Sequence, residues 1–305
     1  MPTRNRADRL KRLVRALEAQ DWPRDDFELI VVDDASGDET SAVLAEVTRS
    51  SCVTVRVLTQ AVSAGPARAR NRGWRFSASP YVAFTDDDCE PARGWLSAGI
   101  AALQRDDGVG IVQGRTLPEV GVAGRAWART REVREPSPFF EGCNLFVGRE
   151  ALEASGGFDE TLGLGFEDTS MGWAILSHGW KRAFAVDAVV HHATTDSGPR
   201  WHIEQGLLRV NLAAVAKRYP EFRRQLWSPW AVNAREAGLT AALLGAVVAF
   251  VWRPGALLAG PYVWINRPFS PGGVWIRRTV VLAVQDLANV AGMVHGSLRH
   301  RVLVV

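Results

Sequence analysis

Three consecutive aspartates, Asp86, Asp87 and Asp88, directly follow the apolar run from Tyr81 to Thr85. At the end of a buried strand their negative charges would repel one another, and a divalent cation would relieve that repulsion. Asp86 and Asp88 have D-x-D spacing, so their oxygens can converge on Mg²⁺ or Mn²⁺, which share their coordination shell with phosphates. A solvated acidic turn without a metal explains the same residues equally well.

A second acidic pair, Asp33-Asp34, ends the apolar run from Phe27 to Val32. The Asp33 carboxylate could accept hydrogen bonds from a nucleotide base or ribose. Asp34 is better explained as a turn residue that caps the following helix. We therefore expect Asp33 to contact a nucleotide.

Basic and amide side chains follow the turn at Gly65-Pro66, where a short helix begins. Arginine binds phosphate oxygens with paired N–H groups, and the start of a helix favours anions. This predicts that Arg70 and Asn71 assist in binding a nucleotide. For Arg68 and Arg72 we prefer a solvated helix face.

A third acidic pair, Glu167-Asp168, lies between a glycine-rich loop and a predicted helix. These carboxylates could simply cap the helix, or one could act as a general base that takes a proton from an acceptor hydroxyl. His192 ends a later strand and could supply a neutral imidazole nitrogen to the metal, with His191 as the weaker candidate.

Strand and helix patterns alternate through residue 105. They predict an α/β fold with a mainly parallel sheet covered by helices on both faces, and ligands at the carboxyl ends of the strands. Residues 1–226 form the predicted catalytic domain, with a nucleotide-binding half at 1–115 and a second half at 116–226. Helices are expected near 10–17, 42–47, 67–77 and 169–177, and strands near 27–32, 53–58, 81–85, 108–114, 144–147 and 183–190.

Charge and cysteine content limit the class of partner. The formal net charge is +3. From Trp227 onward there are seven arginines against Glu236 and Asp286, which gives +5, so residues 1–226 carry −2. A basic tail rich in tryptophan favours a membrane surface over nucleic acid. The three cysteines have no C-x-x-C spacing, which favours a reducing compartment, and no apolar segment follows the basic N-terminus as in a secretory signal.

The C-terminal region, residues 227–305, is hydrophobic and amphipathic. Ala237 to Trp252 contains 16 uncharged residues, or about 24 Å of helix, less than the ~30 Å of a bilayer core. Arg253-Pro254 then interrupts the run, which predicts a kinked span or a re-entrant hairpin; a buried helical pair is the alternative. The apolar stripe from Val280 to Leu298 predicts an interfacial helix.

The ordered series of motifs resembles family 2 glycosyltransferases of the GT-A fold, a nucleotide-diphospho-sugar transferase fold, over about residues 2 to 220. The resemblance rests on PTRNRADRL, ELIVVDDASGDET, GPARARNRG, YVAFTDDDCEP, GCNLFVGREALEASGGFDE, GFEDTSMGWAI and the late histidine pair. It implies an inverting transfer of a sugar from a nucleotide-diphosphate donor, with a divalent cation, Mn²⁺ or Mg²⁺, as cofactor.

The resemblance also assigns roles to residues. The donor would be bound by Pro2, Thr3, Asp33, Arg70, Asn71, Asp86 and Asp87. The metal would be held by Asp88, Asp86 and His192. Asp168 would be the catalytic base, supported by Glu167, and the acceptor side would include Gly142, Cys143, Asn144 and Trp173.

One departure concerns the first strand. Members of the family open with a buried strand before the P-T-R-N segment, and here the sequence starts at Met1-Pro2. We expect that strand to be missing, with unpaired strand edges left behind. The expected acceptor is a glycan, a lipid-linked sugar or an envelope polysaccharide at the cytoplasmic face of the cell membrane. The alternatives are an inactive nucleotide-binding membrane scaffold and a nucleotidyltransferase.

Overall fold

A computed structural model describes residues 1–120, 128–228, 231–265 and 273–304 of the chain, with the side chains of 273–280 left out. The chain forms two compact units, each with its own set of contacts. The first unit comprises residues 1–122 and 130–194, and the second comprises 123–129 and 195–305. The division predicted at residue 226 lies inside the second unit.

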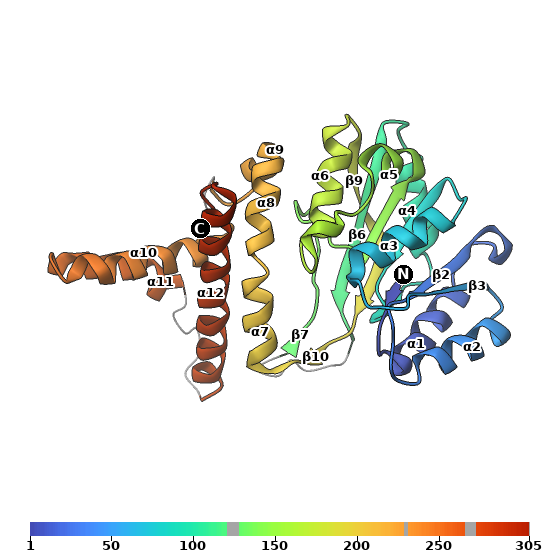
Figure 1. The fold of residues 1–305 in the computed structure, drawn as a ribbon, viewed down its shortest axis with the longest axis horizontal. Helices are drawn as coiled ribbons and strands as arrows, with labels where there is room; N and C mark the ends of the chain where they lie inside the picture. Colours follow the sequence, from blue (N-terminus) through green and yellow to red (C-terminus); the bar gives the residue numbers. More distant parts are fainter. Residues whose placement is uncertain (121–127, 229–230, 266–272, 305) are drawn as a thin grey trace. The chain divides into compact units, whose positions relative to one another are not determined.

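The first unit begins with a small parallel sheet in the order β1-β2-β3 (Figure 1). Its strands are Pro2–Thr3, Glu28–Asp33 and Thr54–Thr59, and its helices are α1 (Ala7–Glu18), η1 (Arg24–Asp26), α2 (Thr40–Ser50) and α3 (Gly65–Phe76). The apolar residues of α1 recur every three or four positions, and Leu10 and Leu13 are fully buried as that spacing predicts. Register pairs Thr3 with Asp33, so both stand at the carboxyl edge of this sheet.

The second sheet of this unit is mixed, in the order β4-β8-β6-β9-β5. Its strands are β4 (Tyr81–Thr85), β5 (Cys89–Pro91), β6 (Val109–Pro118), β8 (Asn144–Gly148) and β9 (Lys181–His192). Only β6 and β9 run parallel, whereas the β4–β8, β6–β8 and β5–β9 pairs are antiparallel. The prediction of a mainly parallel sheet is therefore wrong for this half. A parallel neighbour requires a crossover connection, and β8 instead enters between β4 and β6 in the opposite direction.

Helices cover both faces of this mixed sheet, as predicted. They are α4 (Trp95–Leu103), α5 (Arg149–Ser155), the single turn η2 (Glu160–Leu162) and α6 (Glu167–Ser177). On one face, Trp95 of α4 contacts the Phe146 ring of β8 at a centroid distance of 4.9 Å. Leu145 and Val147 alternate with Phe146 along β8 and point to the other face, where α5 packs against the same strand.

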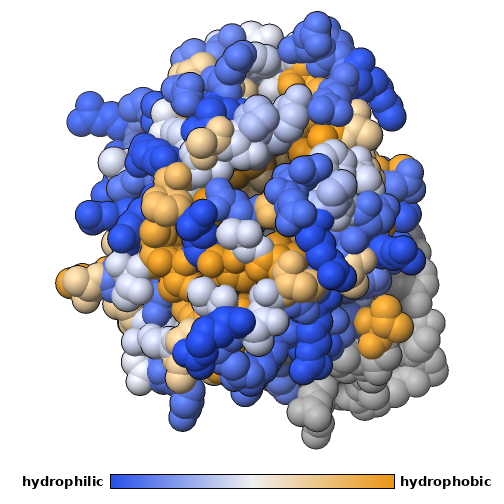
Figure 2. Space-filling model, turned by 90° about the vertical axis from the view of Figure 1, so that its right-hand side faces the viewer, coloured by the Kyte–Doolittle hydropathy of each residue, from blue (hydrophilic) through white to orange (hydrophobic). Residues whose placement is uncertain are grey.

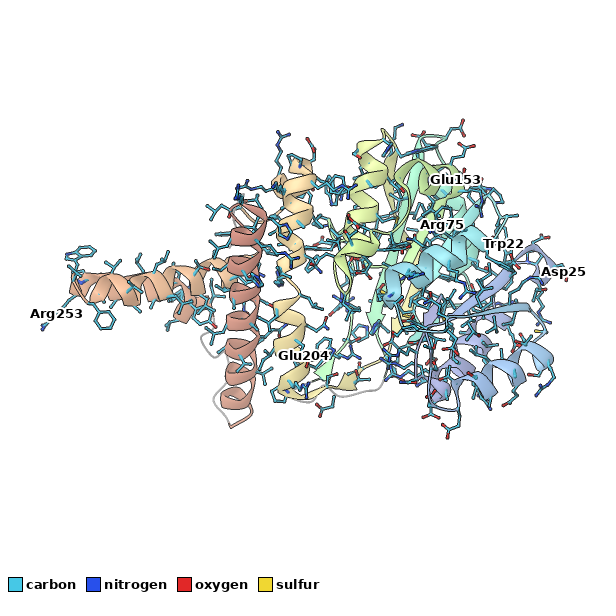
Figure 3. All side chains as sticks on the ribbon, in the orientation of Figure 1. Trp22, Asp25, Arg75, Glu153, Glu204 and Arg253 are labelled. Carbon is cyan, nitrogen blue, oxygen red and sulfur yellow. The ribbon has the colours of Figure 1, made fainter. Side chains whose placement is uncertain are left out.

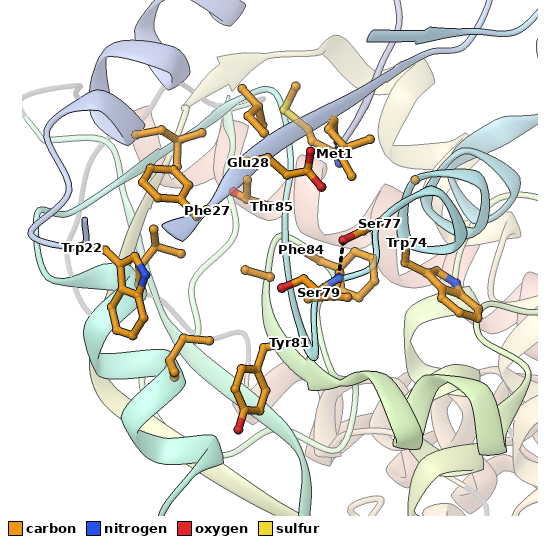
Figure 4. A pocket seen from close by; sticks show the side chains of 18 of the residues that line it. Met1, Trp22, Phe27, Glu28, Trp74, Ser77, Ser79, Tyr81, Phe84 and Thr85 are labelled. Carbon is orange, nitrogen blue, oxygen red and sulfur yellow. Dashed lines mark hydrogen bonds between the residues drawn. The ribbon is translucent and has the colours of Figure 1, made fainter. Parts of the chain in front are cut away.

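A gap lies between β2 and β4, beside the two-residue strand β1. The Met1 amino group, directly before β1, donates to the Ile30 carbonyl at 2.9 Å. Beyond Met1, an apolar cavity of about 170 Å³ separates Glu28–Ile30 from β4 and is also lined by Trp22 (Figure 4). The face that bears β2, β3 and α4 shows apolar surface in a hollow framed by hydrophilic side chains (Figure 2).

The second unit is mainly helical. It contains β7 (Ala128–Arg129), β10 (Thr195–Asp196), α7 (Gly198–Leu207), α8 (Val210–Arg218), α9 (Pro220–Arg224), α10 (Ala234–Ala249), η3 (Arg253–Ala259), α11 (Gly260–Ile265) and α12 (Gly273–His300). α12 packs along α7 and α8, while Leu287, Val294 and Leu298 of the predicted interfacial stripe are exposed. Among the described helices, none combines the length and the hydropathy needed to cross a membrane.

The segment from α10 to α11 is a helical hairpin. η3 and α11 return along α10, so the chain reverses direction at Trp252-Arg253 (Figure 1). The apolar side chains of this hairpin are largely exposed. The alternative prediction of a buried helical pair is therefore wrong for these residues.

Candidate functional site

The three acidic spots predicted from the sequence meet at one rim of the first unit. β2 ends at Asp33 and β4 ends just before Asp86, while Glu167 and Asp168 form the first turn of α6. Arg70 of α3 binds both Asp86 and Glu167. Asp33 is linked through Thr3, which pairs with it in register and donates a hydrogen bond to Asp87. Parallel and mixed α/β sheets bind ligands at this kind of edge.

Arg70 is the central cation of the rim. Its guanidinium donates to Asp86 Oδ1 at 2.7 Å and to Glu167 Oε1 at 2.9 Å. Burial opposes the charge on Arg70, but the surrounding carboxylates raise its pKa, so it stays cationic. Two buried polar atoms lack a hydrogen-bond partner here, Nε of Arg70 and Oε2 of Glu167. Unsatisfied buried atoms at a polar rim fit a site that is completed by a bound polar ligand.

Asp168 is held by backbone groups rather than by a cation. Its Oδ2 accepts from the Gly142 amide at 2.8 Å, and its Oδ1 accepts from the Thr169 amide at 2.7 Å. Each oxygen keeps a lone pair for another donor. Burial raises the pKa of Asp168, although Arg70 and the Gly142 amide oppose the rise. A raised pKa strengthens a carboxylate as a proton acceptor.

Glycines shape the approach to Asp168. Gly165 has φ +85°, a left-handed conformation that strongly favours glycine, and it turns the chain into α6. At Gly142 a Cβ atom would lie 3.2 Å from the Arg70 guanidinium and 3.4 Å from Cβ of Asp168. The predicted acceptor-side residue Gly142 therefore lies between the cation and the carboxylate of the rim.

Asp87 takes a different role from its neighbours. Its Oδ2 accepts a hydrogen bond from the Thr3 hydroxyl at 2.8 Å, and both side chains are buried. Burial raises the pKa of Asp87 to about 6, and the negative charge of Asp88 adds to the rise while Thr3 opposes it. This bond ties the turn after β4 to β1, which places Thr3 and Pro2 next to the acidic turn.

The best metal ligands are Asp88 and His192. Antiparallel pairing sets His192 of β9 opposite Cys89 of β5, and His192 Nε2 lies 3.4 Å from Asp88 Oδ1. Ligand atoms of Asp88, Cys89 and His192 all lie within 4.8 Å of one another. The pKa of the Cys89 thiol is raised well above its usual value by a hydrogen bond with the Cys143 thiol and by burial, so Cys89 remains a neutral thiol.

This donor set fits Mn²⁺ or Mg²⁺ held by two protein ligands. One carboxylate and one imidazole leave the remaining coordination positions to phosphate oxygens and water, as these ions prefer. The Nδ1 of His192 lies 3.0 Å from the Ala193 carbonyl, which leaves Nε2 for the metal. Asp86, predicted as a further ligand, lies outside this cluster and is bound by Arg70.

Asp33 and Asp34 organise the loops beside the rim. Asp33 accepts from the Ser36 amide at 3.0 Å and is 2 % exposed. Asp34 accepts four hydrogen bonds from residues 60–65, among them the Ala64 amide at 2.7 Å. Burial would raise the pKa of Asp34, but these donors together lower it. The prediction that Asp34 caps the following helix is wrong, because Asp34 binds the loop that leads into α3, and α2 begins at Thr40 without a side-chain cap.

Three predicted site residues have their polar atoms turned inward. Asn71 donates to the Phe158 carbonyl and to Glu160, both at 2.8 Å, and so holds the chain after α5. Asn144 is 1 % exposed and bonds Trp95, Arg115 and Ala188 inside the sheet. Trp173 is 5 % exposed and donates to the Pro138 carbonyl at 2.9 Å. In this structure these three side chains position neighbouring segments.

Sequence reasoning missed two residues beside the rim. Arg131 follows the strand β7. Burial opposes its charge, but Cys143 and then Asp168, Glu141 and Asp86 raise its pKa, and its charge in turn lowers the pKa values of Asp86 and Asp168. Arg9 of α1 lies 3.2 Å from Asp88 Oδ2. Arg131 stands in a polar, proline-containing segment with no periodic pattern, so only its charge could have drawn attention to it.

Comparisons with known proteins agree with this geometry. Residues 1–158 match glycosyl transferase family 2, so the chain belongs to that family. It is a glycosyltransferase that uses a nucleotide-sugar donor. The nucleotidyltransferase alternative is therefore excluded.

Individual relatives extend the similarity beyond those residues. The glycosyltransferase AglE of Haloferax volcanii is 26 % identical over 74 % of this chain and 78 % of its own length. A pre-mycofactocin glycosyltransferase of Mycobacterium tuberculosis is 27 % identical over 72 % of this chain, which spans 47 % of that protein.

Solved structures show the same fold. A mannosyltransferase from Pyrobaculum calidifontis, in complex with GDP-Man and Mn²⁺, has a TM-score of 0.64 at 26 % identity, covering 94 % of this chain and 85 % of its own. S. aureus TarS 1-349 in complex with UDP-GlcNAc has a TM-score of 0.54 at 16 % identity over 98 % of this chain and 90 % of that one, which shows the fold alone. Together they place this chain among mixed α/β proteins of the GT-A type.

Proposed function

We propose that this protein transfers a sugar from a nucleotide-diphosphate donor to an acceptor hydroxyl with inversion at the anomeric carbon. The observation that carries the proposal is the convergence of Asp168, Arg70 and Asp86 at one rim, with Asp88 on the turn that also carries Asp86 and His192 at the end of β9 beside it. An inverting transfer needs one proton acceptor and a separate site that binds the leaving diphosphate. The rim has both.

Asp168 is the proposed general base. The acceptor oxygen attacks the anomeric carbon, its proton passes to a carboxylate oxygen of Asp168, and the bond from carbon to the diphosphate oxygen breaks. The electron pair of that bond leaves with the nucleoside diphosphate. The Gly142 and Thr169 amides fix the carboxylate, and burial raises its pKa, both of which favour this step.

Asp88 and His192 would hold Mn²⁺ or Mg²⁺, which would neutralise charge that develops on the diphosphate. Arg131 is the proposed second partner of that charge. Arg70 is already bound by two carboxylates, whereas Arg131 forms no ion pair within the residues that the structure describes. An available cation can form charge-assisted hydrogen bonds to phosphate oxygens.

On the donor side, Pro2, Thr3 and Asp33 form the edge at which we place the nucleoside. GDP-Man and UDP-GlcNAc are bound by the structural relatives, which supports a purine or pyrimidine diphosphate sugar as donor. The acceptor we propose is a glycan, a lipid-linked sugar or an envelope polysaccharide at the cytoplasmic face of the cell membrane. The basic, apolar C-terminal region supports a site at a membrane.

The test is a donor screen with the full chain in mild detergent. GDP-, UDP- and dTDP-linked sugars are assayed for nucleoside diphosphate release with Mn²⁺, with and without a polyprenyl-phosphate or oligosaccharide acceptor. Release that depends on the acceptor, with opposite anomeric configuration in donor and product, is expected. Binding without turnover for every donor would favour the scaffold alternative, and retained configuration would overturn the inverting mechanism.

A further inference from the structure

Twelve large apolar side chains between Leu243 and Ile265 are exposed, which is an unusual concentration on one segment. They lie on α10, η3 and α11, which we call the apolar hairpin. Phe250 is 92 % exposed and Val251 is 95 % exposed, both at the end of the hairpin away from α12 (Figure 1). An apolar surface of this kind on a soluble chain is a binding surface or a cause of aggregation.

Between its charged base and its tip the hairpin is uncharged. From Ala237 to Ile265 the one charged residue is Arg253, which lies at the end of the hairpin (Figure 3). The 16 residues of α10 are about 24 Å long, comparable with much of a ~30 Å hydrocarbon core. At that depth a long arginine side chain can extend its charge toward the opposite headgroups.

The interior of the hairpin is held by backbone contact between small residues. A Cβ at Gly245 would lie 2.5 Å from the Gly255 carbonyl, and a Cβ at Gly255 would lie 2.9 Å from Val248. A Cβ at Gly238 would lie 3.3 Å from Tyr262. Close approach through glycine is how helices associate in lipid, where apolar side chains gain nothing from burying one another. The large side chains are therefore left to face outward.

Charged and polar groups collect at the other end of the hairpin. Arg235 bonds both carboxylate oxygens of Asp286 at 2.7 Å, and Tyr262 donates to the same carboxylate at 3.0 Å. Glu236, 1 % exposed, is bound by Arg209 at 3.0 Å and by Asn289 at 2.9 Å. This network joins the hairpin to α12 and to the residue that precedes α8. It sets a sharp polar limit at the level where an apolar insertion would end.

We propose that the apolar hairpin inserts into a lipid bilayer tip first and leaves on the side it entered, as a monotopic anchor. Its backbone groups are bonded within helices, which lipid requires. Trp252 at the tip and Tyr262 and Trp264 near the base occupy the two levels where aromatic side chains favour the bilayer interface. Lipid is the occupant favoured over a second copy, because exposed apolar side chains occur on all three elements of the hairpin rather than on one helix.

The first test is vesicle flotation of the full chain on phosphatidylcholine in 0.5 M salt. Recovery with the vesicles is expected. The variants Val247→Glu and Val251→Glu should lower the bound fraction at least tenfold, since both positions are exposed, at 68 % and 95 %, and leave packing intact. Val62→Glu, at an exposed site of the first unit, is the matched control and should float like the parent. If both hairpin variants float like the parent, or if the parent chain itself does not float in 0.5 M salt, the insertion proposal is overturned.

A second test reports the polarity around the hairpin tip and needs no variant that weakens membrane binding. Cys52 is the exposed cysteine, since Cys89 and Cys143 are buried. In a Cys52→Ser background, a polarity-sensitive dye at Val251→Cys should shift to the blue on adding vesicles, and the same dye at Val62→Cys should not. An unchanged spectrum at position 251, with a dimer that Val251→Glu converts to monomers, would show that a second copy covers the hairpin instead. Neither test requires glycosyl transfer, so the membrane-anchor proposal would stand even if the proposed function fails.

Discussion

The Oδ2 atom of Asp168 lies 2.8 Å from the amide nitrogen of Gly142, two residues that are 26 positions apart in the sequence. The contact joins the start of α6 to the segment that leads into β8. A glycine at 142 leaves room for the Arg70 guanidinium, which a Cβ at this position would approach to 3.2 Å. The result is a carboxylate with one fixed orientation and a raised pKa, which are the requirements of a general base.

Asp168→Asn should abolish transfer while donor binding with Mn²⁺ persists. The asparagine oxygen can still accept from the Gly142 amide, but the side chain cannot take a proton, so kcat should fall by about 10³. Steady-state kinetics and calorimetric titration of the donor measure the two effects. Glu153→Gln, an exposed carboxylate on α5, is the control. Loss of donor binding in Asp168→Asn would remove this residue from the role of base.

His192→Gln should weaken Mn²⁺ binding by about tenfold or more, because one of the two protein ligands is lost. His191→Gln is the matched control, since the His191 ring lies near the Pro118 carbonyl and on the alternate face of β9. Electron paramagnetic resonance of free Mn²⁺, with nucleoside diphosphate present, measures the affinity. Equal affinities for the two variants would contradict the assignment of His192 as ligand.

Asp87 should make stability fall as pH rises. Its pKa is raised from 3.8 to about 6 in the folded chain, so between these values the folded state binds more protons than the unfolded state. The free energy of unfolding then falls by up to about 3 kcal/mol through this window and is level above it. Urea unfolding without metal, at pH 4.5 and pH 7, tests this. The difference in the free energy of unfolding between the parent and the Asp87→Asn variant should not be the same at the two pH values.

Thr3→Val is the companion variant for that experiment. It removes the hydrogen bond that opposes the rise in the pKa of Asp87. The dependence on pH should therefore become steeper than in the parent. A parent and an Asp87→Asn variant with parallel pH profiles would show that Asp87 does not titrate in this window.

The sequence predicts the parts of the site that follow strands. The run ending at Asp33 and the run ending at Thr85 each predict a strand with its acidic residue at the carboxyl edge, and both are found. Strand direction in the second sheet could not be read locally, because β8 pairs with strands far from it in sequence and its direction depends on the path of the loop. The proximity of Arg131 to Asp86 and Asp168 and the inward bonds of Asn71 to Phe158 and Glu160 also depend on residues far along the chain.

The exposed outer surface of the apolar hairpin was likewise beyond local pattern. A run such as Ala237 to Trp252 has the same composition whether it is buried in a protein or faces lipid. Which residues of this run face outward depends on the close contact between Gly245 and Gly255, and that contact forms only after the chain has folded back at Arg253. Side-chain size at the contact then fixes which residues face outward.

The gap between β2 and β4 should accept one more strand. In a parallel ladder the N–H and C=O of one residue point to the same neighbour, so Ile30, whose carbonyl binds the Met1 amine, also directs its N–H into the gap. Five residues with alternating apolar side chains fused before Met1 should pair with this edge, fill the cavity beside Trp22 and raise Tm by about 5 °C. The same extension with two prolines is the control, because proline cannot donate to the ladder.

The extension should also remove a dependence on pH. The buried Met1 amine has its pKa lowered from 8.0 to about 5, mainly by burial and then by Arg70. The folded state therefore binds fewer protons than the unfolded state between these values, and stability falls as pH drops from 8 to 5. An amide in place of the amine cannot titrate, so thermal unfolding from pH 5 to 8 should lose this component in the extended chain. If the proline control raises Tm equally, the gap does not accept a strand.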